Sequence, residues 1–278
     1  MTTEKNPVSV TKASGQIEPF SIKKLRLSLS RTKATPEEIN SIVETLLPKL
    51  YQGISTQKIY SEAFRLLRHH SKNHAARYHL KRGIMELGPS GFPFEKFIGE
   101  LFKHQGYTVV IGKILQGKCV THEIDVIAGK ENHLNLMECK YRNRPGIAVD
   151  VKTPLYINSR FEDVLANELL KYNEKTFTGW VITNSRFTTD AIAYANCKGM
   201  QLLGWDYPFN NSIKDWVDRT GLYPLTCLTS LTRSEKNWLI AKGYILAKDI
   251  NNNQQLLLQA GVKEPRIKTV MNEGAKLV

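Results

Sequence analysis

Hydrophobic positions in the first 87 residues follow the spacing of short amphipathic helices behind a small hairpin. The stretch VSVTKASGQIEPF reads as two short strands around a turn at Ser14-Gly15. Farther along, Thr35 can cap a helix that starts with Pro36, and Glu38 can complete a capping box. The pattern predicts a hairpin and a small helical bundle, with helices over residues 22–29, from Pro36, from Ser55 and over 75–85.

The hydrophobic period changes repeatedly after a Gly-Pro-Ser-Gly break at residues 88–91. A strong apolar helical face is followed by three short strands, and helices and strands then alternate. This order predicts an α/β domain with a mixed sheet and helices on both faces. The predicted elements are a helix over 94–102, strands over 107–111, 120–128 and 134–141, a helix over 157–172, a strand over 179–183, a helix over 188–198 and a strand over 200–203.

A second, softer break near residues 205–211 separates a small helical C-terminal region. The chain is therefore expected to hold three units, over residues 1–87, 88–206 and 207–278. The last unit loosely resembles helix-hairpin-helix or winged-helix modules that contact the DNA backbone, and a plain helical cap is the alternative. Its predicted helices cover residues 213–219, 234–241 and 254–260.

The net charge of the chain indicates which class of partner to expect. The chain has 278 residues and a formal net charge of +13, with a nearly neutral middle between two basic flanks. Such a balance favours nucleic acid or a nucleotide as partner, although a generic basic surface would give the same number. No apolar run approaches the ~20 residues of a membrane helix, and the four cysteines are scattered. We therefore expect a cytoplasmic protein with no membrane partner.

The stretch HEIDVIAGKENHLNLMECKYRN contains the candidate catalytic residues. Glu138 and Lys140 lie two residues apart on a predicted strand, so their side chains point the same way and Cys139 points the opposite way. A short turn from the preceding strand can place Asp125 opposite Glu138. Two carboxylates and an amine then meet at one position of the sheet.

This arrangement suits phosphodiester hydrolysis. Mg²⁺, or Mn²⁺, prefers oxygen ligands, and Asp125 and Glu138 can supply two of them. Such an ion polarises a phosphoryl oxygen and activates a water, while Lys140 can orient that water or neutralise developing charge. The alternative is a hairpin whose charges simply face solvent.

The same residues resemble the PD-(D/E)xK nuclease signature, with IDV supplying Asp125 and ECK supplying Glu138 and Lys140. The surrounding stretches, GFPFEKFIGELFKHQGYTV and GWVITNSRFTTDAIAYANCKGMQLLGW, resemble the Mrr-like restriction endonuclease family over about residues 88–206. Many Mrr-like members carry Gln where this chain has Glu138. The resemblance implies that Glu95, on the first helix of the domain, supports the metal or the water.

Basic residues around this segment are candidates for contacts with DNA phosphates. Arg142 and Arg144 follow Lys140 on the same alternation, and a solvated basic strand end is the alternative. The weaker candidates are Lys113, Lys118 and Arg160.

The N-terminal stretch VTKASGQIEPFSIKKL resembles the opening of the ATP-cone domain, and AARYHLKRG resembles its closing helix. The resemblance covers about residues 6–87 and implies ATP or dATP as an effector. One departure is that the family's Arg-Asp pair is Ala13-Ser14 here, which removes a phosphate contact. If the cone is kept only as a DNA-binding or dimerising scaffold, it need not bind nucleotide. The implied nucleotide-binding residues are Lys12, Gly15, Glu18, Phe20 and Lys24.

Taken together, these features predict a metal-dependent DNA endonuclease of restriction or repair type, with a nucleotide-sensing N-terminal domain. A homodimer is expected because a double-strand cut needs two active sites. Two alternatives remain: a nucleotide-responsive DNA-binding regulator that does not cut, and a structure-specific junction nuclease. A pure binder has no need for Glu138 and Lys140 beside Asp125, whereas a junction nuclease would share that constellation.

Overall fold

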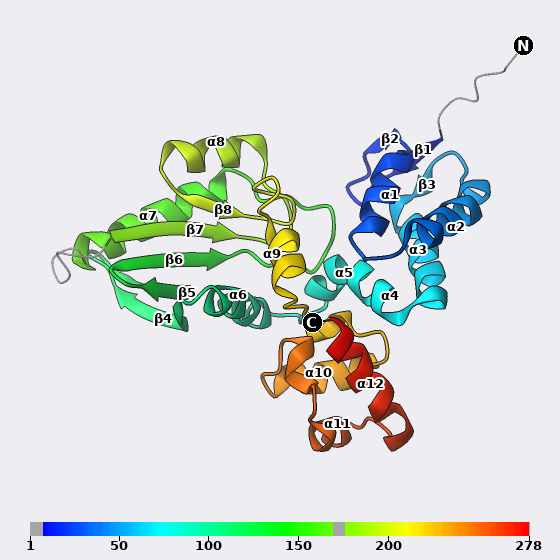
Figure 1. The fold of residues 1–278 in the computed structure, drawn as a ribbon. Coiled ribbons are helices and arrows are strands. Elements are labelled where there is room, and N and C mark those ends of the chain that lie inside the picture. The colour runs from blue at the N-terminus through cyan, green and yellow to red at the C-terminus, as the bar shows by residue number, and fades with distance from the viewer. Residues whose placement is uncertain (1–7, 169–175, 278) are drawn as a thin grey trace, which may run out of the picture.

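The structure is a computed structural model that describes residues 8–168 and 176–277. Figure 1 shows an N-terminal unit of short strands and helices to one side of a larger sheet, with C-terminal helices near both. None of the helices within the described ranges is long and apolar enough to cross a membrane.

The N-terminal unit is built on the predicted hairpin. Strand β1 (Ser9–Thr11) pairs antiparallel with β2 (Ile17–Pro19) around a turn in which Gly15 has a φ of 83°, a conformation that favours glycine. A two-residue strand that the sequence pattern did not predict, β3 (Ile54–Ser55), pairs parallel with β1. The helices of the unit are α1 (Ile22–Ser30), α2 (Pro36–Leu46), α3 (Thr56–His70), α4 (Lys72–Tyr78) and α5 (Leu80–Met85), with a 3-10 turn η1 (Leu47–Lys49) after α2.

Helix boundaries in this unit follow their capping residues. The capping box of Thr35 and Glu38 is present at the start of α2, and Ser55 accepts a hydrogen bond from the backbone N–H of Lys58 at the start of α3. The prediction of a single helix over residues 75–85 is wrong in its start and its continuity. The helical segment begins earlier and divides at His79 into α4 and α5.

The central unit has the predicted order of elements. A five-stranded sheet runs β4-β5-β6-β7-β8; its first three strands are antiparallel, and β7 and β8 join parallel to β6. The mixed α/β prediction is thus confirmed. Of the helix predicted over 157–172, residues 169–172 lie outside the described residues. The elements are α6 (Phe92–His104), β4 (Thr108–Gln116), β5 (Thr121–Lys130), β6 (His133–Cys139), α7 (Lys152–Glu168), β7 (Thr176–Ile182), α8 (Thr189–Cys197) and β8 (Gln201–Leu203).

Helices cover both faces of this sheet (Figure 1). On one face, Phe97 and Phe102 of α6 pack with Met137 and Cys139 of β6 in one buried cluster. On the other face, α7 and α8 pack on a second cluster that includes Leu136 of β6. Neighbouring residues of β6 therefore face opposite layers, as strand geometry requires.

The C-terminal region is helical, as expected, and shares the core of α6. Buried residues of this region, including Leu225 and Cys227, belong to the same apolar cluster as Phe97. The long last helix, α12, was not predicted. The elements are α9 (Ile213–Thr220), η2 (Leu225–Cys227), α10 (Arg233–Ala241), η3 (Ala247–Ile250), α11 (Gln254–Gln259) and α12 (Glu264–Leu277).

Candidate active site

Two neighbouring central strands bring Asp125 and Glu138 together. Strand β5 pairs with β6 so that Val126 lies opposite Met137, and the next position of that register places Asp125 opposite Glu138. The Oδ2 atom of Asp125 accepts a hydrogen bond of 2.7 Å from the backbone N–H of Cys139. The Asp125 carboxylate is thereby fixed at the end of β6, where the paired part of the two strands ends.

Glu138 lies between two cations. Its side chain is only 6% exposed, and its two oxygens form ion pairs with Nζ of Lys140 at 2.5 Å and with Nη1 of Arg160 at 2.8 Å. The expected alternation is present, because Lys140 meets Glu138 whereas Cys139 lies in the core on the opposite face. A buried carboxylate needs such partners, since an unpaired buried charge is costly.

Glu95 reaches the same site from the first turn of α6. Partial burial raises its pKa to about 7, and the charges of Asp125, Glu123 and Glu138 add to this shift. The pKa of Asp125 rises to about 6, first through burial and then through the charge of Glu138. The site therefore carries more negative charge than Lys140 and Arg160 neutralise.

The donor set fits a hard divalent cation held jointly by protein, water and substrate. Asp125 and Glu138 can supply carboxylate oxygens. Burial and then neighbouring carboxylates raise the pKa values of Asp125 and Glu95, and a cation would favour their ionised forms. Within residues 8–168 and 176–277, no group of three or more His, Cys, Asp and Glu side chains forms a metal cage on its own. A site with two carboxylate ligands is consistent with both observations.

The predicted DNA-contacting residues lie in four different places, one of which is Arg160 of α7 beside Glu138. Arg142 and Arg144 follow Lys140 in the loop after β6, and both line a pocket toward the N-terminal unit. Lys113 lines a separate depression over β4 and β5 with Val164 of α7. Lys118 lies in the turn between β4 and β5. The structure therefore brings only Arg142 and Arg144 together.

The residues that the ATP-cone resemblance assigns to nucleotide lie around the hairpin. Glu18 forms ion pairs with Lys12 at 2.5 Å and with Lys24 at 3.4 Å, and Gly15 lies in the turn. Phe20 packs against the apolar core of the N-terminal unit instead of standing free. Lys12, Glu18 and Lys24 are thus neighbours, and Phe20 has a packing role.

The sequence analysis gave too little weight to two residues that support the site or the loop next to it. Arg160 of α7, a weak DNA-contacting candidate, pairs with Glu138 and also donates to the backbone carbonyl of Glu123. Asn184, interpreted as part of a turn, accepts from the N–H of Arg142 at 2.8 Å and donates to its carbonyl at 2.8 Å. A signal for Asn184 was present, because a polar residue directly after a buried strand often holds a neighbouring loop.

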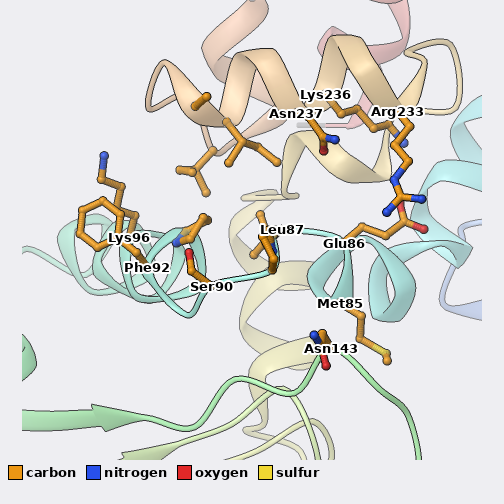
Figure 2. Close-up of a pocket in the computed structure, with 16 residues that line it drawn as sticks. Met85, Glu86, Leu87, Ser90, Phe92, Lys96, Asn143, Arg233, Lys236 and Asn237 are labelled. Atoms are coloured by element: carbon orange, nitrogen blue, oxygen red, sulfur yellow. The ribbon is translucent and has the colours of Figure 1, made fainter.

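A large cavity lies next to the start of α6, the helix that carries Glu95. It has a volume of 990 Å³ and opens between α10 and the start of α6. Figure 2 shows Lys96 and Phe92 of α6 on one side, Arg233, Lys236 and Asn237 of α10 on another, and Asn143 below. Glu95, Asp125 and Glu138 do not line this cavity, so it is separate from the candidate active site.

The class of the central unit follows from its sheet and its carboxylates. The sequence profile described as "Restriction endonuclease" matches residues 88–206, and the one described as "AF1548-like, C-terminal" matches residues 223–278. A restriction endonuclease domain implies a nuclease, a hydrolase whose substrate is DNA. Neither profile extends over residues 1–87, so the ATP-cone assignment rests on the sequence resemblance alone.

The chain aligns with nearly the whole length of two related sequences or structures. An uncharacterized protein of Archaeoglobus fulgidus is 30% identical over 183 residues, which are 65% of this chain and 99% of the relative. The crystal structure of a protein of unknown function, AF1548, is 28% identical with a TM-score of 0.56, covering 67% of this chain and 97% of that chain. The chain belongs to the family of this archaeal protein. In this chain, the region matched by the restriction endonuclease profile precedes the AF1548-like C-terminal region.

Proposed function

We propose that this protein is a metal-dependent endonuclease that hydrolyses phosphodiester bonds in DNA. One observation carries the proposal: Asp125, Glu138, Lys140 and Glu95 come from three separate elements and interact at the end of β6. The profile match over residues 88–206 supports the same chemistry. A sheet that merely bound DNA would have no use for three partly buried carboxylates, which repel phosphate.

The roles of the residues follow from their surroundings. Asp125 and Glu138 would hold a Mg²⁺ or Mn²⁺ ion, and such an ion, when bound, polarises the phosphoryl group and acidifies a bound water. Lys140 places a positive charge beside them that can orient the attacking water or offset charge developing on the phosphate. Glu95, with a pKa of about 7, can exchange a proton near neutral pH. Arg160 would position Glu138 through their ion pair.

The flanking units supply the proposed partners. Lys12, Glu18 and Lys24 around the hairpin support binding of ATP or dATP as an effector. Arg233 of α10 and Lys96 of α6 line the cavity in Figure 2 next to the helix that carries Glu95, which supports contact of the C-terminal region with DNA. A homodimer would place two active sites on one duplex.

Cleavage of a panel of DNA substrates tests the proposal. Wild type, Lys140→Ala and the surface control Lys198→Ala would be incubated with supercoiled plasmid, methylated plasmid and a four-way junction. Each reaction would be run with Mg²⁺ or EDTA, and with or without ATP. We expect cutting that requires the metal and Lys140 but not Lys198, and the ATP reactions show whether the nucleotide acts as a switch. If all three substrates stay intact while the protein still shifts them in a gel, the protein is a DNA-binding regulator.

A further inference from the structure

A pocket of 280 Å³ lies where the N-terminal unit meets the loop after β6. It lies close to the candidate active site along the chain, because Arg142 is two residues beyond Lys140. Residues from six separate segments line it: the hairpin turn, the start of α3, α5, the loop after β6, the stretch between β7 and α8, and the loop after β8. The basic residues among them are Lys12, Lys81, Arg142, Arg144 and Arg186.

Positive charge in this pocket exceeds negative charge by a wide margin. Asp206 is the one acidic residue of the lining. Among the described residues, no carboxylate lies within ion-pair distance of Arg142, Arg144 or Arg186, in contrast to Lys12, which pairs with Glu18 at 2.5 Å. Like charges gathered without counter-charges repel one another, so a polyvalent anion would stabilise the group.

Two side chains of the pocket are partly desolvated without full compensation by polar or charged partners. The Nε atom of Arg142 is buried and has no hydrogen-bond partner among the described residues, which is uncommon for a buried polar atom. Desolvation lowers the pKa of Lys81, and Arg186 and Lys214 lower it further against the opposing effect of Asp206. Both side chains would gain from an anion beside them.

The pocket is held open by contacts that leave the guanidinium groups available. Asn184 fixes Arg142 through its backbone N–H and carbonyl, so the side chain takes no part in that bond. Gly146 has a φ of 92° and lies so close to the hairpin that a Cβ there would be 3.0 Å from the backbone of Ala13. The loop and the hairpin turn therefore touch, and the cations of both lie around one space.

The ligand chemistry follows from the donors. Guanidinium groups present paired N–H donors that match the oxygens of phosphate, and a phosphate group carries enough charge to offset several cations. The pocket is too small to enclose a whole nucleotide, since ordinary small-molecule pockets start at about 300 Å³. It suits phosphate groups whose remaining parts extend outward.

We propose that this pocket is a phosphate-binding site built jointly by the N-terminal unit and the nuclease domain. It brings Lys12, which the ATP-cone resemblance assigns to nucleotide, together with Arg142 and Arg144, predicted to contact DNA. A phosphate there would link the two units through a loop that begins two residues from Lys140 along the chain. The phosphate belongs either to a free nucleotide or to the DNA backbone, and both share the same chemistry.

Binding measurements on the full chain test this site without any cleavage. The probes are tripolyphosphate and ATP by calorimetry, and a 20-base-pair duplex by fluorescence anisotropy, all in EDTA. The variants are Arg144→Ala and Arg186→Ala, both at exposed positions, and the control is Arg68→Ala, an exposed arginine of α3 outside the pocket. Thermal unfolding of each variant checks that the fold is kept.

We expect Arg144→Ala and Arg186→Ala each to weaken phosphate binding by about tenfold, as for a lost charge-assisted hydrogen bond, while Arg68→Ala changes nothing. Loss confined to tripolyphosphate and ATP identifies a free nucleotide as the source. Loss of duplex affinity with a shallower salt dependence identifies the DNA backbone. If neither variant changes the binding of any probe relative to Arg68→Ala, the site does not exist, and the proposed nuclease chemistry would be unaffected.

Discussion

At the scale of single residues, the central feature is that three neighbouring carboxylates differ in how well their negative charges are compensated. Glu138 is nearly buried but has two cationic partners. Burial and neighbouring carboxylates raise the pKa values of Asp125 and Glu95, and the backbone hydrogen bond that Asp125 accepts from Cys139 offsets only part of its shift. The charge that remains unneutralised would favour a cation at this position, as the proposed function requires.

Arg160 is predicted to act as a positioning residue through Glu138. Arg160→Met removes one of the two ion pairs of Glu138, and we expect a 10–100-fold loss of cleavage rate, the usual cost of removing a supporting partner of a metal ligand. Arg160→Lys should restore part of the rate. A purely structural role would lower the unfolding temperature of both variants equally and leave the apparent Mg²⁺ requirement unchanged, so Mg²⁺ titrations of the rate separate the two roles.

Cation binding is predicted to strengthen with pH. The folded-state pKa values of Glu95 and Asp125, about 7 and about 6, lie above ordinary carboxyl values, so ionising these groups costs stability. Their favourable contribution is complete at pH values below about 4 and is lost as pH rises through both folded-state values. Mg²⁺ should offset that loss, so it should raise the unfolding temperature more at pH 8 than at pH 5.

The control for this pH dependence is Asp125→Asn, which removes one ionisable group and one ligand. The pH-dependent Mg²⁺ effect should shrink markedly in this variant. An equal Mg²⁺ effect at both pH values in the wild type would contradict the assignment of the carboxylates as ligands.

At this scale, the sequence predicted what is local and missed what is distant. The alternation along β6 was sufficient to pair Glu138 with Lys140, because side chains two residues apart share a face. Arg160 is 22 residues from Glu138 and comes from a helix on that face, so no local spacing reports their contact. Glu95 was assigned to the site only through family resemblance, since a carboxylate at the start of a helix is also an ordinary surface residue.

At the scale of elements, capping residues and period changes were the reliable signals. The start of α2 at Pro36 matches its capping box, and the order of elements in the central unit follows the changes of hydrophobic period. The strand β3 has only two residues and forms through parallel pairing with β1, which leaves no local signal. Helix α12 did have one, with Ile267, Val270 and Leu277 buried at helical spacing.

The capping box of α2 gives an element-scale prediction. Thr35→Ala removes the side chain that accepts from the Glu38 N–H, and we expect the free energy of unfolding to fall by about 1 kcal/mol. Thr45→Ala, on the same helix, is the matched control and should change stability by less than about 0.5 kcal/mol. Urea unfolding measures both. Equal effects of the two substitutions would show that the cap contributes nothing.

At the scale of the whole molecule, the nuclease domain and the C-terminal helices share one apolar core with α5. The hydroxyl of Thr226 donates to the buried carbonyl of Gly83, and Arg31 of the N-terminal unit forms ion pairs with Asp215 at 3.1 Å and with Asp218 at 2.5 Å. The AF1548-like region is therefore structurally joined to α6, the helix that carries Glu95. This shared core could not be predicted from the sequence, because it depends on contacts between residues more than a hundred positions apart.

Gly83 tests this shared core. A Cβ at position 83 would lie 2.6 Å from Sγ of Cys227, so we expect Gly83→Ala to destabilise the protein by about 1–3 kcal/mol. The double variant Gly83→Ala/Cys227→Ala should recover part of that loss beyond the sum of the single effects. Additive effects in urea unfolding would show that the two residues do not touch.

The most direct test of the account is the single-turnover rate of DNA cleavage with Mg²⁺, measured for wild type and Lys140→Ala at saturating protein. Affinity for the same duplex, measured in Ca²⁺, shows whether the variant still binds. We predict a rate loss of at least about 10²-fold with unchanged DNA affinity, because Lys140 acts on charge at the reacting phosphate. Equal cleavage rates for the two proteins would contradict the assignment of Lys140 and its neighbouring carboxylates as the active site.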